Sequence, residues 1–156
     1  MQTPEGDIPL TASLYYALSR IQRTDGSINI WADGISINQS DATEKSQQIS
    51  LLPTIYRQAT QVYGWVGDGA NDSSLALKSL QDIHASPLMV SRLGKRAWAA
   101  IIELFARAWF VRAWIIQEVI LARDLQIVCG AEKLPWETLY SAVQTCEKYA
   151  ETSVKN

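Results

Sequence analysis

The sequence predicts a protein of the α/β class, with a parallel sheet covered by helices on both faces. Short apolar runs of strand length alternate with segments of helical periodicity, and the strand-like runs are residues 28–32, 62–66 and 125–129. Such alternation is typical of strand–helix–strand units, in which a helix returns the chain to begin the next parallel strand. A chain of 156 residues is the length of about one domain. We therefore expect a polar, flexible lead-in over residues 1–9 and a single domain over residues 10–156.

Two helices are expected in the first half of the chain. Apolar residues recur at helical spacing from Leu14, so Thr11 is a suitable N-cap for a helix that ends near residue 23. Asp41 and Glu44 have the spacing of a capping box, which predicts a second helix to about Ala59. Pro53 lies inside that helix and removes a backbone donor, so a kink or a break is expected there.

The second half is expected to hold two helices, a third strand and a last helix. Asp72 or Ser73 can cap a helix that runs through Ile83, and one long helical pattern fills about residues 91–122, with a bend near Trp109. After the strand at 125–129, residues 130–133 have the composition of a turn, and a final helix covers about residues 136–151.

Composition excludes several function classes. The 14 basic and 16 acidic side chains leave a net charge of −2, which does not favour nucleic-acid binding. Cys129, Cys146 and the single His84 do not have the spacing of a metal site, so no metal is expected. No apolar run has the length of a membrane span, and the first residues do not have the order of a signal peptide. We therefore expect a cytoplasmic protein without a membrane partner.

Polar side chains follow the first two predicted strands. Asp33, Asn38 and Gln39 come after the run at 28–32, and Gly67–Gly69 follow the run at 62–66. Ligands of open parallel sheets bind beyond the carboxyl ends of the strands, so both segments are candidate walls of a site. The alternatives are that the Asp33 carboxylate caps its own loop and that Gly67–Gly69 form a plain turn.

Glu118 is the strongest single candidate for a functional side chain. It lies four residues after Trp114, so a carboxylate and an indole share one helical face, with Arg112 nearby. The flanking residues are apolar, and a buried carboxylate is costly without a partner. Glu118 therefore either serves a site or is held by an internal ion pair or a backbone cap.

Five segments of the chain resemble, in order and spacing, the motifs of the HET (heterokaryon incompatibility) domain of filamentous fungi. The resemblance spans about residues 10–142. The segments are Trp31-Ala-Asp-Gly-Ile-Ser-Ile-Asn-Gln39, Glu44-Lys-Ser-Gln-Gln48, Ile55-Tyr-Arg-Gln-Ala59, Trp65-Val-Gly67 and Trp109-Phe-Val-Arg-Ala-Trp-Ile-Ile-Gln-Glu118.

This resemblance implies a signalling or interaction module in fungal non-self recognition and programmed cell death. It also implies distant kinship with TIR domains, which have a flavodoxin-like three-layer sheet and signal by assembling. Many TIR domains hydrolyse NAD, and by that analogy Glu118 would be the key carboxylate and Trp114 a wall of the pocket. The alternative function is thus an NAD glycohydrolase that releases nicotinamide, with NAD as substrate and no cofactor. Whether the chain is an enzyme stays open.

The chain departs from the family pattern at its first strand. Family members begin with a strand of an aromatic-Ser-Tyr-x-Trp-Gly type, and nothing comparable precedes Leu10. That strand is central in a flavodoxin-like order, so its absence would leave sheet edges without a partner. We therefore expect protein partners or self-association into an oligomer, with a nucleotide as a further candidate ligand.

Overall fold

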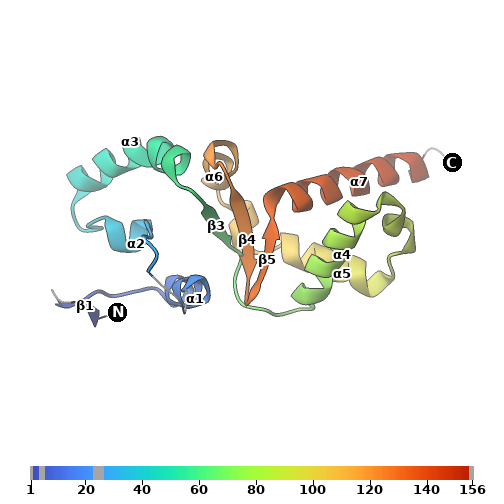
Figure 1. Ribbon diagram of the computed structural model, residues 1–156, viewed down its shortest axis with the longest axis horizontal. Coiled ribbons are helices and arrows are strands. Elements are labelled where there is room, and N and C mark those ends of the chain that lie inside the picture. Colours follow the sequence, from blue (N-terminus) through green and yellow to red (C-terminus); the bar gives the residue numbers. More distant parts are fainter. Residues whose placement is uncertain (1, 4–5, 23–26, 155–156) are drawn as a thin grey trace. The chain divides into compact units, whose positions relative to one another are not determined.

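The computed structural model describes residues 2–3, 6–22 and 27–154. The chain divides into two compact units, Met1–Gln58 and Ala59–Asn156. The first contains two short strands and three helices among its described residues, and the second contains a three-stranded sheet with the remaining helices (Figure 1). The α/β class predicted from the sequence is therefore confirmed.

The N-terminal unit begins with a short strand pair and continues as helices. Strand β1 (Gln2–Thr3) pairs antiparallel with β2 (Gly6–Asp7). The helices are α1 (Ala12–Ile21), α2 (Asp33–Ser36) and α3 (Ala42–Gln58). Both predicted N-caps are confirmed: Thr11 Oγ1 accepts from the backbone N–H of Leu14 at 3.2 Å, and Asp41 Oδ1 accepts from that of Glu44 at 3.0 Å. The second bond of a capping box differs, because Glu44 Oε1 accepts from the backbone N–H of Asn38 at 3.1 Å.

The predicted strand at residues 28–32 is wrong, and of the kink or break predicted at Pro53 the break does not occur. Residues 28–32 form no strand, although the backbone of Ala32 is extended, with φ −144° and ψ 132°. Extended dihedral angles alone do not make a strand, because a strand also needs the hydrogen bonds of a neighbour. Helix α3 also runs through Pro53 without a break. The carbonyl of Ile49, which loses its partner at Pro53, lies on a residue that is 38% exposed, where water can bind it.

The sheet of the C-terminal unit has the strand order β3–β4–β5 (Figure 1). Strands β3 (Val62–Trp65) and β4 (Leu125–Cys129) match the predicted runs and pair in parallel. Strand β5 (Glu132–Pro135) occupies part of the predicted turn and pairs antiparallel with β4. The prediction of an all-parallel sheet is therefore wrong for β5. Gly130, at φ +56°, permits the tight return from β4 to β5.

The helices of this unit include two that match the prediction to within three residues, α4 and α7, and several short ones where one long helix was predicted. They are α4 (Ser73–Ala85), η1 (Pro87–Arg92), α5 (Lys95–Phe105), η2 (Ala108–Val111), α6 (Ile115–Leu121) and α7 (Trp136–Val154). One continuous helix over residues 91–122 is wrong, because this segment divides into the end of η1, α5, η2 and α6. The bend predicted near Trp109 is confirmed, since the chain breaks on both sides of η2. That break turns Trp109 into the core, where only 4% of the residue is exposed. Burial of a large indole outweighs helical continuity at this point.

The core of the C-terminal unit lies between the sheet and helices α4, α5 and α7. Helix α4 packs against α5 and α7, and α7 also contacts β4 and β5 (Figure 1). The side chains with no measurable exposure are Ala76, Leu80, Ile83, Ile127, Leu134 and Ala142. Across the described part of the chain, no helix is both long enough and apolar enough to cross a bilayer.

Candidate functional site

Glu118 is buried and hydrogen bonded to an indole. Its residue is 8% exposed, and its Oε2 accepts from Trp109 Nε1 at 2.9 Å. The segment from Trp109 to Glu118 therefore brings an indole and the carboxylate together, and the indole that donates the hydrogen bond is that of Trp109. A hydrogen bond to a charged acceptor offsets part of the cost of burying the carboxylate. Trp109 is thus one hydrogen-bond partner of the Glu118 carboxylate, and the sequence did not predict it.

Trp109 fixes the position of this carboxylate through its packing. A Cβ added to Gly64 of β3 would lie 2.6 Å from Trp109 Cζ2, so the indole lies directly against the strand backbone. The ring also contacts two further aromatic rings edge-on, with centroids 5.0 Å from Phe110 and 6.3 Å from Trp136. Glu118 is thus connected through one rigid indole to the middle of β3.

Trp114 and Arg112 lie at the surface. Trp114 is the N-cap residue of α6 and is 44% exposed, and its carbonyl accepts from the backbone N–H of Glu118 at 3.3 Å. Arg112 is exposed at the end of η2. Between Trp114 and Glu118, the side chain of Gln117 has a buried Oε1 without a hydrogen-bond partner. A buried acceptor without a hydrogen-bond partner is unusual in a folded protein.

The three candidates after residues 28–32 form a local loop within the N-terminal unit. Asp33 Oδ1 accepts from the backbone N–H of Gly34 at 2.8 Å, and Gln39 Nε2 donates to the carbonyl of Asp33 at 2.8 Å. Asn38 Oδ1 accepts from the backbone N–H of Ser40 at 3.1 Å. All three side chains therefore have backbone partners that shape the approach to α3, which agrees with the alternative in which Asp33 caps its own loop.

The loop after β3 is held by Arg107, which sequence reasoning missed as a site residue. Its Nη1 donates to the carbonyls of Val66 at 3.1 Å and Asp68 at 2.9 Å, and to Cys129 Sγ at 3.1 Å. Its Nη2 donates to the carbonyl of Ala70 at 2.9 Å. One guanidinium thus ties the ends of two parallel strands to the segment between α5 and η2. No sequence motif marks this role, since backbone carbonyls can come from any residue type.

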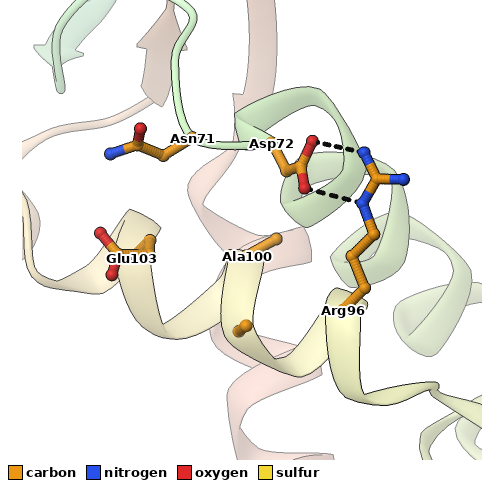
Figure 2. A pocket seen from close by; sticks show the side chains of 6 residues that line it. Asn71, Asp72, Arg96, Ala100 and Glu103 are labelled. Atoms are coloured by element: carbon orange, nitrogen blue, oxygen red, sulfur yellow. Dashed lines mark hydrogen bonds and ion pairs between the residues drawn. The ribbon is translucent and has the colours of Figure 1, made fainter.

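A shallow depression of about 360 Å³ lies between the start of α4 and one face of α5 (Figure 2). Asp72 and Arg96 form a bidentate ion pair across it, with both N–O distances 2.8 Å. The hydrogen bonds from Arg96 lower the pKa of the Asp72 carboxyl. Asn71 and Asp72 both have positive φ, at 52° and 57°. The sequence predicted Asp72 or Ser73 as the N-cap of α4. Asp72 is the N-cap residue, but its side chain makes no capping bond because its carboxylate binds Arg96.

A second, apolar hollow of about 470 Å³ lies between Trp98 of α5 and the last turns of α7. Cys146 lines it, and burial raises the pKa of this thiol. Among the residues that the structure describes, no group of three or more His, Cys, Asp or Glu side chains is arranged to hold a metal ion.

Comparisons with known proteins agree with the order of these segments. The family profile described as "Heterokaryon incompatibility protein (HET)" matches residues 1–118. The chain is also similar to "Heterokaryon incompatibility protein 6, OR allele" of Neurospora crassa, at 32% identity over 136 residues. That alignment covers 65% of this chain and 20% of the Neurospora protein, so the chain spans a small part of that relative. No solved structure matches. The chain belongs to the HET, or heterokaryon incompatibility, family.

Proposed function

We propose that this chain acts as a signalling and interaction module in fungal non-self recognition, and that its activation leads to programmed cell death. The observation that carries the proposal is the match of the HET profile to residues 1–118, which include every segment around Trp109 and Glu118. The printed name of the Neurospora relative places that protein in heterokaryon incompatibility.

Exposed apolar side chains support an interaction role. On η2 and α6 the residues Val111, Ile116 and Ile120 are 76%, 61% and 71% exposed. Ile116 and Ile120 are four apart and share one side of the helix. Large exposed apolar side chains that cluster on one element are typical of protein interaction surfaces. Helix α6 is thus buried on the Glu118 side and apolar on another side.

The proposal extends to the fold. The parallel pair β3–β4 and the helices between them agree with part of a flavodoxin-like, TIR-like sheet. In such a sheet a further strand would lie beyond β3. We propose that the active form contains a sheet extended at this edge.

Inducible expression in a filamentous fungus tests the proposed function. We expect growth arrest and uptake of a vital dye when the chain is expressed, and a weaker response for Trp109→Ala, which removes the indole that holds Glu118. Lys148→Gln, on the exposed side of α7, is the matched control and should act as the wild type. Normal growth at a protein level equal to that of a known inducer of cell death would refute the proposal.

NAD cleavage is the second candidate function. The observation that favours it is the buried, unpartnered Oε1 of Gln117, the residue that precedes Glu118 in α6, because such an acceptor suits the amide N–H of a nicotinamide. Glu118 would then stabilise the positive charge that develops on the ribose as nicotinamide leaves. Nicotinamide release by purified protein, lost in Glu118→Gln at unchanged far-UV circular dichroism, tests this candidate. The absence of turnover at high protein concentration would remove it.

A further inference from the structure

Strand β3 forms one edge of the three-stranded sheet, and its outward side has no strand partner among the described residues. The backbone N–H groups of Val62 and Val66 donate inward, to the carbonyls of Asp124 at 2.7 Å and Val128 at 3.0 Å. In a parallel ladder alternate residues point to opposite sides, so the backbone groups of Tyr63 and Trp65 point away from β4. Edge groups of this kind are a template for another strand.

The opposite edge of the sheet is protected against such pairing. The register of β5 with β4 pairs Val128 with Lys133 and Gln126 with Pro135. By the same alternation these two residues of β5 direct their backbone groups away from β4. Lysine and proline are the residues with which natural edge strands resist further pairing. Strand β3 carries neither a charge nor a proline over Val62–Trp65, so the two edges differ in the features that block a partner.

We propose that β3 pairs antiparallel with β3 of a second copy of this chain, around a twofold axis at Gly64. This inference rests on the proposed function, since it names the partner at the sheet edge. An axis at Gly64 places Tyr63 opposite Trp65 of the other copy. These are the two residues whose backbone groups point outward, so each pair exchanges both of its N–H···O=C bonds. The strand is therefore complementary to itself in this register.

The side chains suit the same register. Tyr63 and Trp65 are two apart, lie on one face of the sheet and are half-buried. Each would meet the other aromatic ring across the twofold axis, and cross-strand aromatic pairs stabilise antiparallel strands. A register displaced by one residue would place the outward groups of Tyr63 opposite inward groups of the partner strand. The second copy is favoured over an unrelated strand because one surface supplies both halves of an isologous contact.

Sedimentation velocity of the full chain tests the proposal. We expect a monomer–dimer equilibrium in the wild type and, for Tyr63→Pro, a dissociation constant raised by at least about tenfold. Proline at position 63 removes an outward N–H and leaves the inward bonds of β3 in place. Lys133→Pro makes the same change at an outward position of β5, but it also removes the ammonium that lies 5.2 Å from the centroid of the Tyr63 ring. Lys133→Ala removes that ammonium and keeps the N–H, so it is the matched control for this contact. Both variants should dimerise as the wild type. A wild-type monomer over the whole concentration range, or an equal dissociation constant for Tyr63→Pro, would overturn the proposal.

Disulfide trapping tests the register without relying on a proline variant. In a Cys146→Ser background, Tyr63→Cys combined with Trp65→Cys should form covalent dimers on mild oxidation. Facing residues of an antiparallel pair have Cα atoms about 5.5 Å apart, within the range of a disulfide. The control pair Lys133→Cys and Pro135→Cys lies on the other edge. Equal trapping by the two pairs would contradict pairing through β3.

The outcomes separate this inference from the proposed function. A trapped β3 dimer in a chain that causes no growth arrest would uphold the interface and remove the cell-death proposal. Growth arrest by a chain that is monomeric and is not trapped would remove the interface and uphold the signalling role.

Discussion

Trp109 donates its indole N–H to the buried carboxylate of Glu118, at 2.9 Å, and the same indole packs against Gly64 of β3. The bond spans nine residues of a segment that the sequence presents as one helix. It closes because η2 ends before α6 begins, so that the indole turns back toward the first turn of α6. The segment from Trp109 to Glu118 therefore has a structural role, because it fixes the short helix α6 against the sheet.

Removing either partner of this bond should destabilise the fold. Trp109→Phe removes the indole N–H that Glu118 accepts and reduces packing against β3, so we expect a loss of about 2–4 kcal/mol in the free energy of unfolding. Glu118→Gln keeps an acceptor oxygen but introduces an amide NH₂ group. We expect it to lower the free energy of unfolding by about 1–3 kcal/mol. Urea denaturation followed by fluorescence and circular dichroism measures both variants.

A double-mutant cycle separates the bond from general packing. If the indole and the carboxylate interact as the structure shows, the double variant should be more stable than the sum of the single losses predicts, by about 1–2 kcal/mol. Strict additivity would contradict a direct bond. Trp98→Phe is a useful comparison, because Trp98 lines the apolar hollow beside α7.

Gly64→Ala should be costly because the added methyl group meets Trp109. Its Cβ would lie 2.6 Å from Cζ2 and 3.0 Å from Ile127 Cδ1, and both neighbours are buried. We expect a loss of about 1–3 kcal/mol from overpacking. Gly94→Ala is the matched control, since no heavy atom lies within 4 Å of its added Cβ. Equal thermal midpoints for the two variants would show that the indole moves aside freely.

Much of the C-terminal unit could be predicted from local pattern, and the exceptions have physical causes. The apolar runs that became β3 and β4 are buried strands with near-continuous hydrophobicity, which sequence patterns mark clearly. Strand β5 was missed because only Leu134 is buried within it, so it has no apolar run. Its antiparallel pairing depends on the tight turn at Gly130, which also suits an ordinary loop.

In the candidate site, too, the sequence predicts local features but not contacts between distant segments. Glu118 could be identified because a carboxylate among apolar residues is unusual in any helix. The indole that binds it could not be identified from the sequence, because the choice between Trp109 and Trp114 depends on where the helix breaks. The role of Arg107 was equally hidden, since its acceptors are mostly backbone carbonyls of a loop about 40 residues earlier, 41 for Val66 and 39 for Asp68.

Arg107→Lys should loosen the loop after β3 with little change elsewhere. A lysine ammonium cannot reproduce the fork that reaches the carbonyls of Val66, Asp68 and Ala70 together. We expect the free energy of unfolding to fall by about 1–3 kcal/mol, and the backbone amides of Gly67–Ala70 to exchange faster. Hydrogen exchange measured by mass spectrometry resolves this segment. Arg112→Lys, at an exposed arginine, should leave exchange there unchanged.

The ion pair between Asp72 and Arg96 should make stability depend on pH in the acidic range. The hydrogen bonds from Arg96 lower the pKa of Asp72, so the folded state holds the charged carboxylate more strongly than the unfolded state does. The stabilisation is complete above the unfolded pKa of about 3.9 and is lost as the pH falls through the lower folded pKa. An NMR titration of the Asp72 carboxyl carbon should give a higher midpoint in Arg96→Gln than in the wild type. Both groups are exposed, so high salt should reduce the difference. Identical midpoints in low salt would mean that the bidentate contact does not persist in solution.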